Sequence, residues 1–225
     1  MVTSRPTQRL YLFTPPLGDP TAFLPDLDAA LGAGDIAAVL LRLAPADEGT
    51  LIARAKTVAA AVQRRDVAVL LDGHADLVAR SGADGAHLTG VDAFAAALAL
   101  LKPERIAGAG GLRSRHDAML AGETGADYVM FGEPFAPPSR AAEDKGEDNG
   151  GSRRPPLEET LDRLEWWAHL VEIPCVGYAA SLDEVAALAQ TGADFIALGD
   201  WIWTEPQDAG KGAAAAVAAA AEHLA

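Results

Sequence analysis

The sequence predicts an α/β fold, a single (β/α)8 TIM barrel, because eight short apolar segments alternate with helical segments along its 225 residues. Half of the residues are apolar, which is enough for one sizeable core. Three turns share one phrase, SGADG at 81–85, TGADY at 124–128 and TGADF at 191–195. Repetition of one helix-to-strand corner favours a closed ring of parallel strands. The alternative is an open doubly wound sheet. That fold usually has a glycine-rich motif after its first strand, and the sequence TPPLG at 14–18 is not such a motif.

The expected strands are short apolar runs, as in strands that are buried on both faces. The first alternates weakly, the second is interrupted only by Arg42, and the third is rich in valine. The fourth follows the GADG turn, and the fifth leads into Gly110-Gly111. We expect strands at residues 9–13, 36–43, 67–71, 86–88, 105–109, 127–132, 173–178 and 194–198.

The expected helices combine apolar residues at helical spacing with a high alanine content. Ser114 and Ser181 are placed to cap two of them. We expect helices at 21–32, 48–65, 75–80, 93–101, 114–122, 157–171, 182–192 and 212–224, with a short helical turn at 200–204. Within this one domain of residues 1–225, the stretch 133–156 is rich in Pro, Gly, Ser and charge, which predicts a flexible loop, either an active-site lid or simple disorder.

Composition and charge exclude several classes of partner. A formal net charge of −14 argues against a nucleic-acid surface and against docking on anionic lipid, since both need clustered Lys and Arg. The first ten residues lack the apolar stretch of a signal peptide, and no run reaches the ~20 residues that span a bilayer. A single cysteine, Cys175, lies in an apolar run, where a small buried hydrophobe is expected. We therefore expect a cytoplasmic protein with a small-molecule partner, and leave a homodimer open.

Residues that follow the expected strands would share one rim of the barrel. Asp72 and Asp92 could share Mg²⁺, which prefers oxygen ligands and bridges to phosphates, or could simply cap their helices. Arg42 should reach the rim and meet either a ligand phosphate or a carboxylate, with Asp72 as the expected partner. The expected rim set is Thr14, Arg42, Asp72, His74, Asp92, Gly110, Gly111, Arg140, Tyr178, Ala179, Ala180, Ser181, Gly199 and Asp200.

A phosphate site is often formed after strands seven and eight of such barrels, from backbone N–H groups at the start of a short helix. Ala179-Ala180-Ser181 and Gly199-Asp200-Trp201 occupy those places here. Alanine restricts the φ > 0 conformations that a phosphate nest uses, and Asp200 would repel an anion, so the residues weaken this prediction. A lone histidine on the fourth strand, His87, is expected to be a satisfied core residue.

With these residues in place, the chain resembles the thiamine phosphate synthase family, including its thiazole tautomerase relatives, along nearly its whole length. Five motifs carry the resemblance: LYLFT at 10–14, LLD at 70–72, GADGAHL at 82–88, GADYVMFG at 125–132 and PFAPPSR at 134–140. The resemblance implies a (β/α)8 transferase of thiamine biosynthesis. Such an enzyme joins a hydroxymethylpyrimidine diphosphate to a thiazole phosphate with Mg²⁺ and releases pyrophosphate.

The motifs of that family are changed at several positions. Its Gln-x-Arg-x-Lys strand becomes LLRLA at 40–44, which keeps Arg42, and its Asn-Asp pair becomes Asp72-Gly73, while Asp92 matches its second metal aspartate. Its lid lysine corresponds to Arg140, its Ser-Thr-His is replaced around Gly110-Gly111, and its Gly-Gly phosphate loop becomes Ala179-Ala180.

The resemblance implies roles for these positions. Arg42 and Arg140 would neutralise the departing pyrophosphate, and Asp72 and Asp92 would hold Mg²⁺. The substrates would be bound by Thr14, His74, Gly110, Gly111, Ala179, Ala180 and Gly199. Because so many contacts differ at once, the alternative is an inactive or repurposed member that binds a small phosphorylated ligand or a partner protein. A tautomerase would need an acid or base after the fifth strand, where only glycines are visible.

Overall fold

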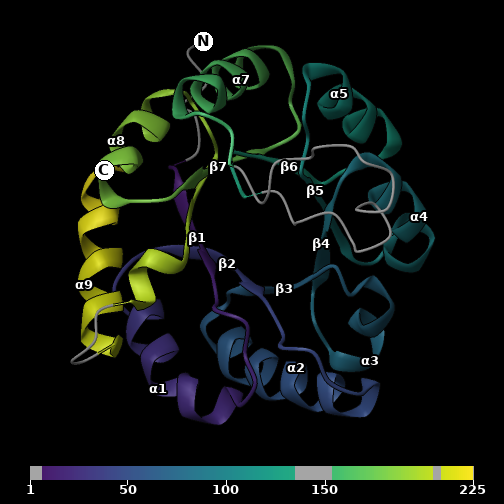
Figure 1. Ribbon diagram of the computed structural model, residues 1–225, viewed down its shortest axis with the longest axis vertical. Helices are drawn as coiled ribbons and strands as arrows, with labels where there is room; N and C mark the ends of the chain where they lie inside the picture. The colour runs from purple at the N-terminus through teal and green to yellow at the C-terminus, as the bar shows by residue number, and fades with distance from the viewer. Residues whose placement is uncertain (1–6, 135–153, 205–208, 225) are drawn as a thin grey trace, which may run out of the picture.

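Eight parallel strands, β1 to β8, close into a ring in the computed structural model, which describes residues 7–134, 154–204 and 209–224 (Figure 1). Each strand pairs with its neighbours in chain order, and β1 also pairs with β8, so the sheet has no free edge. The (β/α)8 prediction is confirmed. The strands are β1 Arg9–Phe13, β2 Ile36–Leu41, β3 Ala68–Asp72, β4 Gly85–Thr89, β5 Ile106–Gly110, β6 Tyr128–Phe131, β7 Cys175–Ala179 and β8 Phe195–Leu198.

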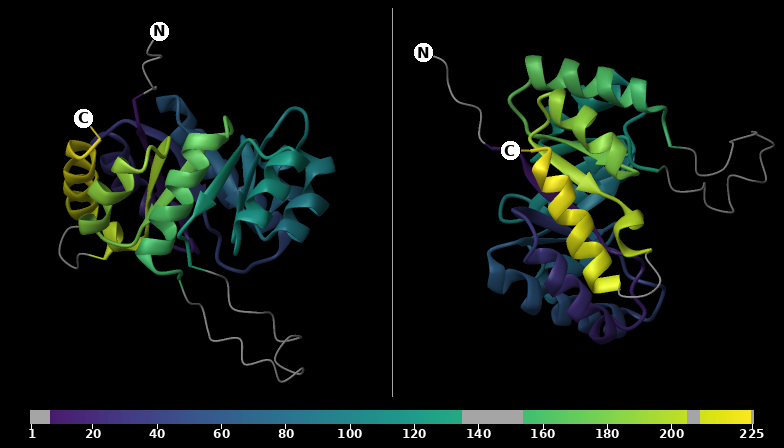
Figure 2. Two further views of the ribbon diagram at one scale, coloured as in Figure 1. Left: turned by 90° about the horizontal axis from the view of Figure 1, so that it is seen from above. Right: turned by 90° about the vertical axis from the view of Figure 1, so that its left-hand side faces the viewer.

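Helices surround the ring of strands as an outer layer, which the side views make plain (Figure 2). Ser114 caps α5 as predicted, through a reciprocal capping box with Asp117. Ser181 occupies the start of α8 without a side-chain cap bond. The helices are α1 Pro20–Leu31, α2 Glu48–Val62, α3 Val78–Ser81, α4 Val91–Leu101, α5 Arg115–Thr124, α7 Leu157–Leu170, α8 Leu182–Gln190 and α9 Ala209–Glu222, with 3₁₀ turns at Gln63–Arg65, Ala75–Leu77 and Asp200–Trp203.

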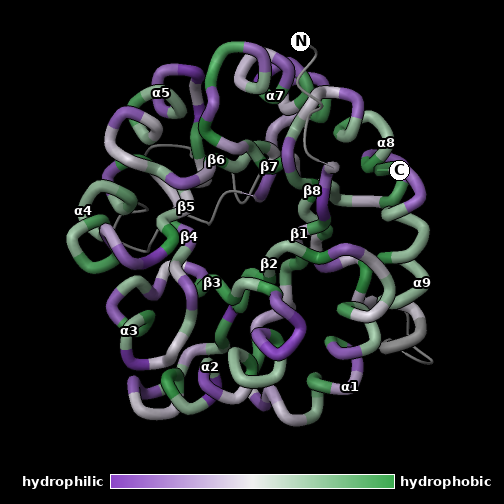
Figure 3. Tube along the Cα trace, turned by 180° about the vertical axis from the view of Figure 1, so that it is seen from behind, coloured by the Kyte–Doolittle hydropathy of each residue, from purple (hydrophilic) through white to green (hydrophobic). Residues whose placement is uncertain are grey.

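The core has two layers because every strand is buried on both faces, and the strands are accordingly coloured as mainly hydrophobic in Figure 3. The outer layer lies between strands and helices. The inner layer fills the barrel and includes an aromatic group formed by Tyr11, Phe13, Tyr128 and Tyr178. Phe13 and Tyr178 meet edge to face, with ring centroids 5.1 Å apart. These aromatic rings close the centre of the barrel and support the residues above them.

The three repeated corners clamp neighbouring strands together. Gly82, Gly125 and Gly192 each have positive φ, as the shared phrase predicts. The aspartate two residues later then accepts a hydrogen bond from a backbone N–H at the start of the preceding strand, from its first or second residue. Asp84 accepts from Val69 N at 2.7 Å, Asp127 from Ala107 N at 2.7 Å, and Asp194 from Cys175 N at 2.8 Å. We call the end of the ring where these aspartates lie the base, and the end where the strands finish the mouth.

Two boundaries differ from the expected ones and affect the mouth. β2 ends at Leu41, so Arg42 follows the strand instead of lying within it. Of the stretch expected as a loop at 133–156, residues 135–153 lie outside the described part of the chain, but its first residue, Glu133, is buried with 6 % of its surface exposed. In the described part of the chain, none of the helices is long and apolar enough to cross a membrane.

Candidate functional site

A pocket of ≈ 270 Å³ opens at the mouth of the barrel, and we call it the mouth pocket. Its wall is apolar on one side and charged on the other, which suits a ligand with both a ring and an anionic group. The residues that line it come from seven of the eight strands or the turns that follow them. They are Phe13, Leu40, Arg42, Asp72, His87, Thr89, Glu133, Pro134, Tyr178 and Asp200.

Arg42 is fixed at the rim by contacts on both sides. Its Nε donates to the carbonyl oxygen of Thr14 at 2.6 Å, and its Nη2 forms an ion pair with Asp200. Its backbone N–H donates to Thr14 Oγ1 at 3.0 Å, so the buried Thr14 orients the arginine. The guanidinium also lies over the Phe13 ring, 5.8 Å from its centroid. A cation is thus held at the mouth pocket with Nη1 free of hydrogen bonds to the described residues.

The carboxylate partner of Arg42 is Asp200, and the expected pairing with Asp72 is absent from the described contacts. Asp72 ends β3 and lines the mouth pocket, yet its side chain makes no hydrogen bond or ion pair with a described residue. Burial raises the pKa of the Asp72 carboxyl, and the positive charges of Arg42 and His74 partly offset that rise. Asp72 is therefore a desolvated carboxylate without a bonded partner, a group that a bound cation would stabilise.

The second expected metal residue, Asp92, lies in the first turn of α4 with an exposed side chain. Within the described ranges it is not among the residues that line the mouth pocket, and no three His, Cys, Asp or Glu side chains converge as a metal cluster. Mg²⁺ is often held by only one or two carboxylates together with water and substrate phosphates. Asp72, which lines the mouth pocket, suits a site of that kind, and the described residues form no cage built from protein ligands alone.

Glu133 is the principal site residue that sequence reasoning missed. It is the second residue after β6, lines the mouth pocket and accepts a hydrogen bond from Gly111 N through Oε1. Burial raises the pKa of its carboxyl to about 7; the Gly111 hydrogen bond and Arg163 lower the pKa, and the charge of Asp72 raises it further. A buried acid or base therefore lies beside the two glycines, where the sequence predicted none. The available signal was a lone glutamate two residues after a fully apolar strand.

His87 lies next to Glu133 on the floor of the pocket. Its Nδ1 is 2.9 Å from the Tyr128 hydroxyl, which is itself 3.0 Å from the Tyr11 hydroxyl. Its Nε2 is buried and has no hydrogen-bond partner in the described structure. Burial lowers the pKa of the ring to about 4, so the imidazole is neutral at pH 7. The expectation of a satisfied core histidine is confirmed for its burial and for one of its two ring nitrogens.

Gly110 and Gly111 make room for these two side chains. A Cβ on Gly110 would overlap both Glu133 Oε1 and His87 Nε2, so these atoms lie against the same glycine. Gly111 has φ +63° and presents its N–H to Glu133. Both glycines lie at the mouth, as the sequence predicts. Because Gly110 has no side chain, the Glu133 carboxyl and the His87 imidazole can occupy the space beside it.

The alanines expected at a phosphate loop have backbone groups already in use. Ala180 N donates to Glu184 Oε2 at 2.8 Å, and Ala179 O accepts from Trp201 Nε1 at 3.0 Å. Gly199 lies against the Tyr178 hydroxyl, where a Cβ would overlap it. A phosphate at this position would have to compete with Glu184 for the Ala180 amide.

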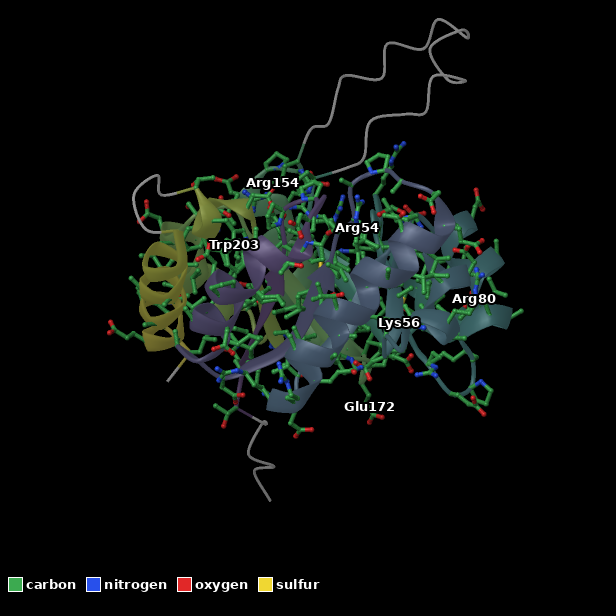
Figure 4. The ribbon with its side chains drawn as sticks, turned by 90° about the horizontal axis from the view of Figure 1, so that it is seen from below. Arg54, Lys56, Arg80, Arg154, Glu172 and Trp203 are labelled. Atoms are coloured by element: carbon green, nitrogen blue, oxygen red, sulfur yellow. The ribbon has the colours of Figure 1, made fainter. Side chains whose placement is uncertain are left out.

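Arg154 closes this side of the mouth. It donates to both carboxylate oxygens of Glu184 at 2.7 Å and to the carbonyl oxygens of Gly132 and Tyr178 at 2.7 and 3.0 Å. Figure 4 labels Arg154 at one edge of the barrel and Glu172, which precedes β7, at the opposite edge. The arginine therefore ties the ends of β6 and β7 together. Arg140, the other cation expected here, lies outside the described residues.

The positions expected to form the rim thus divide into two groups. Arg42, Asp72, Tyr178 and Asp200 line the mouth pocket together. Thr14 supports Arg42 from below, and His74 precedes the turn Ala75–Leu77, close enough for its charge to lower the pKa of Asp72. Of the remaining expected residues that the structure describes, Asp92 lies on α4, and the others lie at or just after the ends of β5, β7 and β8.

Comparison with known proteins gives one consistent result. Residues 10–202 match the family model for thiamine monophosphate synthase. A thiamine-phosphate synthase from Rhodospirillum centenum is 42 % identical over 93 % of this chain and 94 % of its own length, and one from Hyphomonas neptunium is 39 % identical over 96 % and 93 %.

Solved structures agree on the fold. A thiamine phosphate pyrophosphorylase from Pyrococcus furiosus superposes with a TM-score of 0.72 at 24 % identity, covering 97 % of this chain and 98 % of that one. A 3-hexulose-6-phosphate synthase from Salmonella typhimurium superposes with a TM-score of 0.65 at 17 % identity, covering 96 % and 100 %. At these identities the structures establish the barrel alone. From its family match and its similarity to the curated relatives, the chain belongs to the thiamine monophosphate synthase family.

Proposed function

We propose that this chain is a thiamine phosphate synthase, a transferase that joins a hydroxymethylpyrimidine diphosphate to a thiazole phosphate and releases pyrophosphate. The observation that carries the proposal is the mouth pocket, which combines an oriented arginine, a desolvated carboxylate and an apolar wall. It lies at the strand ends where barrel enzymes of this kind carry their active sites. Support also comes from curated relatives that are named thiamine-phosphate synthases over nearly their full length.

Arg42 is proposed to neutralise the departing pyrophosphate. Its Nε and Nη2 are held by Thr14 and Asp200, which leaves Nη1 for an anionic oxygen. A cation whose orientation is fixed before the reaction stabilises developing negative charge without the cost of reorganisation. Arg140 would add a second cation, as the family resemblance implies.

Mg²⁺ is the cofactor of this proposal, and Asp72 and Asp92 would hold it, since this ion needs only one or two protein carboxylates. When bound, the ion would supply charge neutralisation for the diphosphate group. The raised pKa of Asp72 supports this assignment, because a divalent cation offsets the cost of keeping that carboxylate charged while partly buried.

The apolar wall is proposed to hold the two rings in line for the transfer. Phe13 and Tyr178 present an edge-to-face aromatic surface, and Leu40 lies beside them in the pocket lining. Orienting the ring nitrogen of the thiazole toward the pyrimidine carbon turns a bimolecular step into an effectively unimolecular one. The protein contributes position and charge in this scheme.

A direct assay tests the proposal. The purified chain is incubated with both substrates and Mg²⁺, and the expected products are thiamine phosphate and pyrophosphate in equal amounts. Absence of product at enzyme concentrations where a bona fide synthase turns over readily would overturn it. The alternative, an inactive or repurposed member, then gains support if the substrates or pyrophosphate raise the melting temperature without turnover, since a ligand at a hundred times its Kd stabilises by ~2.7 kcal/mol.

The cellular setting completes the proposal. We propose a cytoplasmic enzyme with a small phosphorylated substrate, no nucleic-acid partner and no membrane association, in line with the net charge of −14. A homodimer is part of the same proposal and is checked by light scattering at the concentration of the assay.

A further inference from the structure

Arg42 already shares its charge with a carboxylate before any ligand binds. Asp200 forms an ion pair with Arg42 Nη2, and both residues line the mouth pocket. The Asp200 side chain is 53 % exposed and that of Arg42 is 23 % exposed, so the carboxylate is the more solvent-exposed partner. An anion that approaches Arg42 therefore meets a negative charge that is bound to the same guanidinium.

The turn that carries Asp200 is fastened to two strand ends. Trp201 Nε1 donates to the carbonyl oxygen of Ala179 at 3.0 Å, at the end of β7. Trp203 Nε1 donates to the carbonyl oxygen of Phe13 at 2.6 Å, at the end of β1. The turn is thus held at the mouth by contacts other than the ion pair with Arg42, and it keeps the Asp200 carboxylate near the guanidinium.

Negative charge exceeds positive charge in the lining of the mouth pocket. Among the described residues that line it, Arg42 is the one cation, whereas Asp72, Glu133 and Asp200 carry carboxyl groups. Burial raises the pKa of Glu133 to about 7, so that carboxyl is about half ionised at pH 7. An anion is therefore attracted by one group and repelled by several, and the balance between them decides which anions stay bound.

The proposed reaction changes the charge of the group that Arg42 faces. The bond between the pyrimidine methylene carbon and a diphosphate oxygen breaks, and its electron pair stays on that oxygen. The same carbon forms a new bond to the thiazole nitrogen. The released pyrophosphate therefore carries one more negative charge than the diphosphate ester, and it has lost the ring that would pack on the apolar wall. A carboxylate beside Arg42 repels this product more strongly than it repels the substrate.

We propose that Asp200 is a specificity-determining residue that weakens the binding of free pyrophosphate relative to the diphosphate ester and so favours release of the product. The inference rests on the proposed function for the identity of the anion. Arg42 attracts both anions, and Asp200 supplies a repulsion that grows with the charge of the anion. Since release of product limits turnover in many enzymes, a charge that acts mainly on the product has a use at this position.

Isothermal titration calorimetry of the full chain tests the inference with two anions, inorganic pyrophosphate and methyl diphosphate, an ester with a minimal carbon group. All titrations use one Mg²⁺ buffer of low ionic strength. Asp200→Asn keeps an oxygen for Arg42 Nη2 and removes the charge. This variant should bind pyrophosphate about tenfold more tightly than the wild type does, and methyl diphosphate only about threefold more tightly.

Two controls separate the charge of Asp200 from other effects. Asp35→Asn makes the same change at an aspartate that is paired with Arg9 at the base, and it should leave both affinities within about twofold of the wild type. Asp200→Glu keeps the charge and should keep the wild-type affinities. The gain in Asp200→Asn should also shrink as the salt concentration rises from about 0.05 M to about 0.5 M, because screening weakens interactions between exposed charges. A purely structural role would not give this salt dependence.

The outcomes separate this inference from the proposed function. Equal or weaker binding of pyrophosphate by folded Asp200→Asn, an equal gain for both anions, or no binding by either protein would overturn the inference even if the chain makes thiamine phosphate. A gain that is larger for pyrophosphate supports it even if the transferase assay fails. Circular dichroism confirms that each variant is folded.

Discussion

The two ends of the barrel interior differ in how their polar groups are satisfied. A cavity at the base, lined by the first residues of several strands, has a volume of ≈ 380 Å³ and is larger than the mouth pocket at ≈ 270 Å³. Its lining is mostly apolar, and its two charged residues are paired, Arg9 with Asp35 and Asp127 with Lys102. The mouth pocket keeps Asp72 and His87 Nε2 without hydrogen-bond partners in the described structure.

This difference teaches that unsatisfied polar groups mark the functional end of this molecule better than volume does. Tyr128 belongs to both regions, since it lines the base cavity and hydrogen-bonds to His87 on the floor of the mouth pocket. The hydroxyls of Tyr11 and Tyr128 thus lie between a base whose charged side chains are paired and a mouth where Asp72 and His87 Nε2 have no hydrogen-bond partner in the described structure. Four predictions test this contrast, beginning with the largest expected effect.

The first prediction concerns the buried carboxyl that only the mouth contains. The pKa of Glu133 rises from 4.5 to about 7 on folding, so its contribution to stability is fully present below pH 4.5 and is lost as the pH rises through 7. Glutamine does not titrate. Relative to the wild type, Glu133→Gln should gain up to about 3 kcal/mol in the free energy of unfolding between pH 5 and pH 8.

Urea denaturation of both proteins at the two pH values measures this gain. His87, whose pKa falls to about 4, contributes stability above pH 6.5 that is lost as the pH falls through 4. That contribution is present in both proteins and cancels in the difference. A difference that does not change with pH would show that Glu133 titrates normally.

The second prediction compares two arginines that are each paired with an aspartate, one at the mouth and one at the base. Arg42→Ala removes a cation held at the mouth pocket and should lower kcat/KM for thiamine phosphate formation about 100-fold. Arg9→Ala removes the exposed pair with Asp35 and should leave kcat/KM within about threefold of the wild type. Steady-state kinetics of the two variants decide the matter, and equal losses would contradict the assignment of function to the mouth.

The third prediction concerns the two tyrosines between the cavities. Tyr128→Phe leaves His87 Nδ1 buried without its donor and should lower the free energy of unfolding by about 1–3 kcal/mol. Tyr11→Phe removes only one end of the chain and should cost less, about 1 kcal/mol. Thermal and urea unfolding of the pair give the comparison, and a larger loss in Tyr11→Phe would contradict donation from Tyr128 to His87.

The smallest effect is expected at the base cavity. Ala68→Val adds two methyl groups to its lining at the start of β3, where a β-branched residue suits a strand. Filling a cavity of this kind typically adds about 0.5–2 kcal/mol of stability. The variant should keep wild-type kcat/KM, and a marked loss of activity would place part of the site at the base.

Sequence reasoning succeeded where the physical cause was local. The three glycine-aspartate corners, the Ser114 cap and the eight apolar runs each depend on residues within a few positions of one another, and all are confirmed in the structure. Their repetition was sufficient to predict the closed ring.

Partners across the mouth were harder to predict because they come from distant parts of the chain. Arg42 and Asp200 are 158 positions apart, so proximity in sequence pointed to Asp72 instead. Glu133 was predicted to begin the loop at 133–156, because that stretch is rich in Pro, Gly, Ser and charged residues. Its burial depends on the absence of a side chain at Gly110 on the neighbouring strand, a feature that becomes visible only once β5 and β6 are paired.

The aspartate corners have a consequence for how the ring is divided. Asp84, Asp127 and Asp194 join β3 to β4, β5 to β6 and β7 to β8, and Asp35 joins β2 to Arg9 at the start of β1. The barrel thus contains four pairs of neighbouring strands, and a side-chain hydrogen bond joins the two strands of each pair at the base. Loops at the mouth can then change in sequence without breaking these hydrogen bonds at the base, so closure of the barrel does not depend on the residues of the mouth.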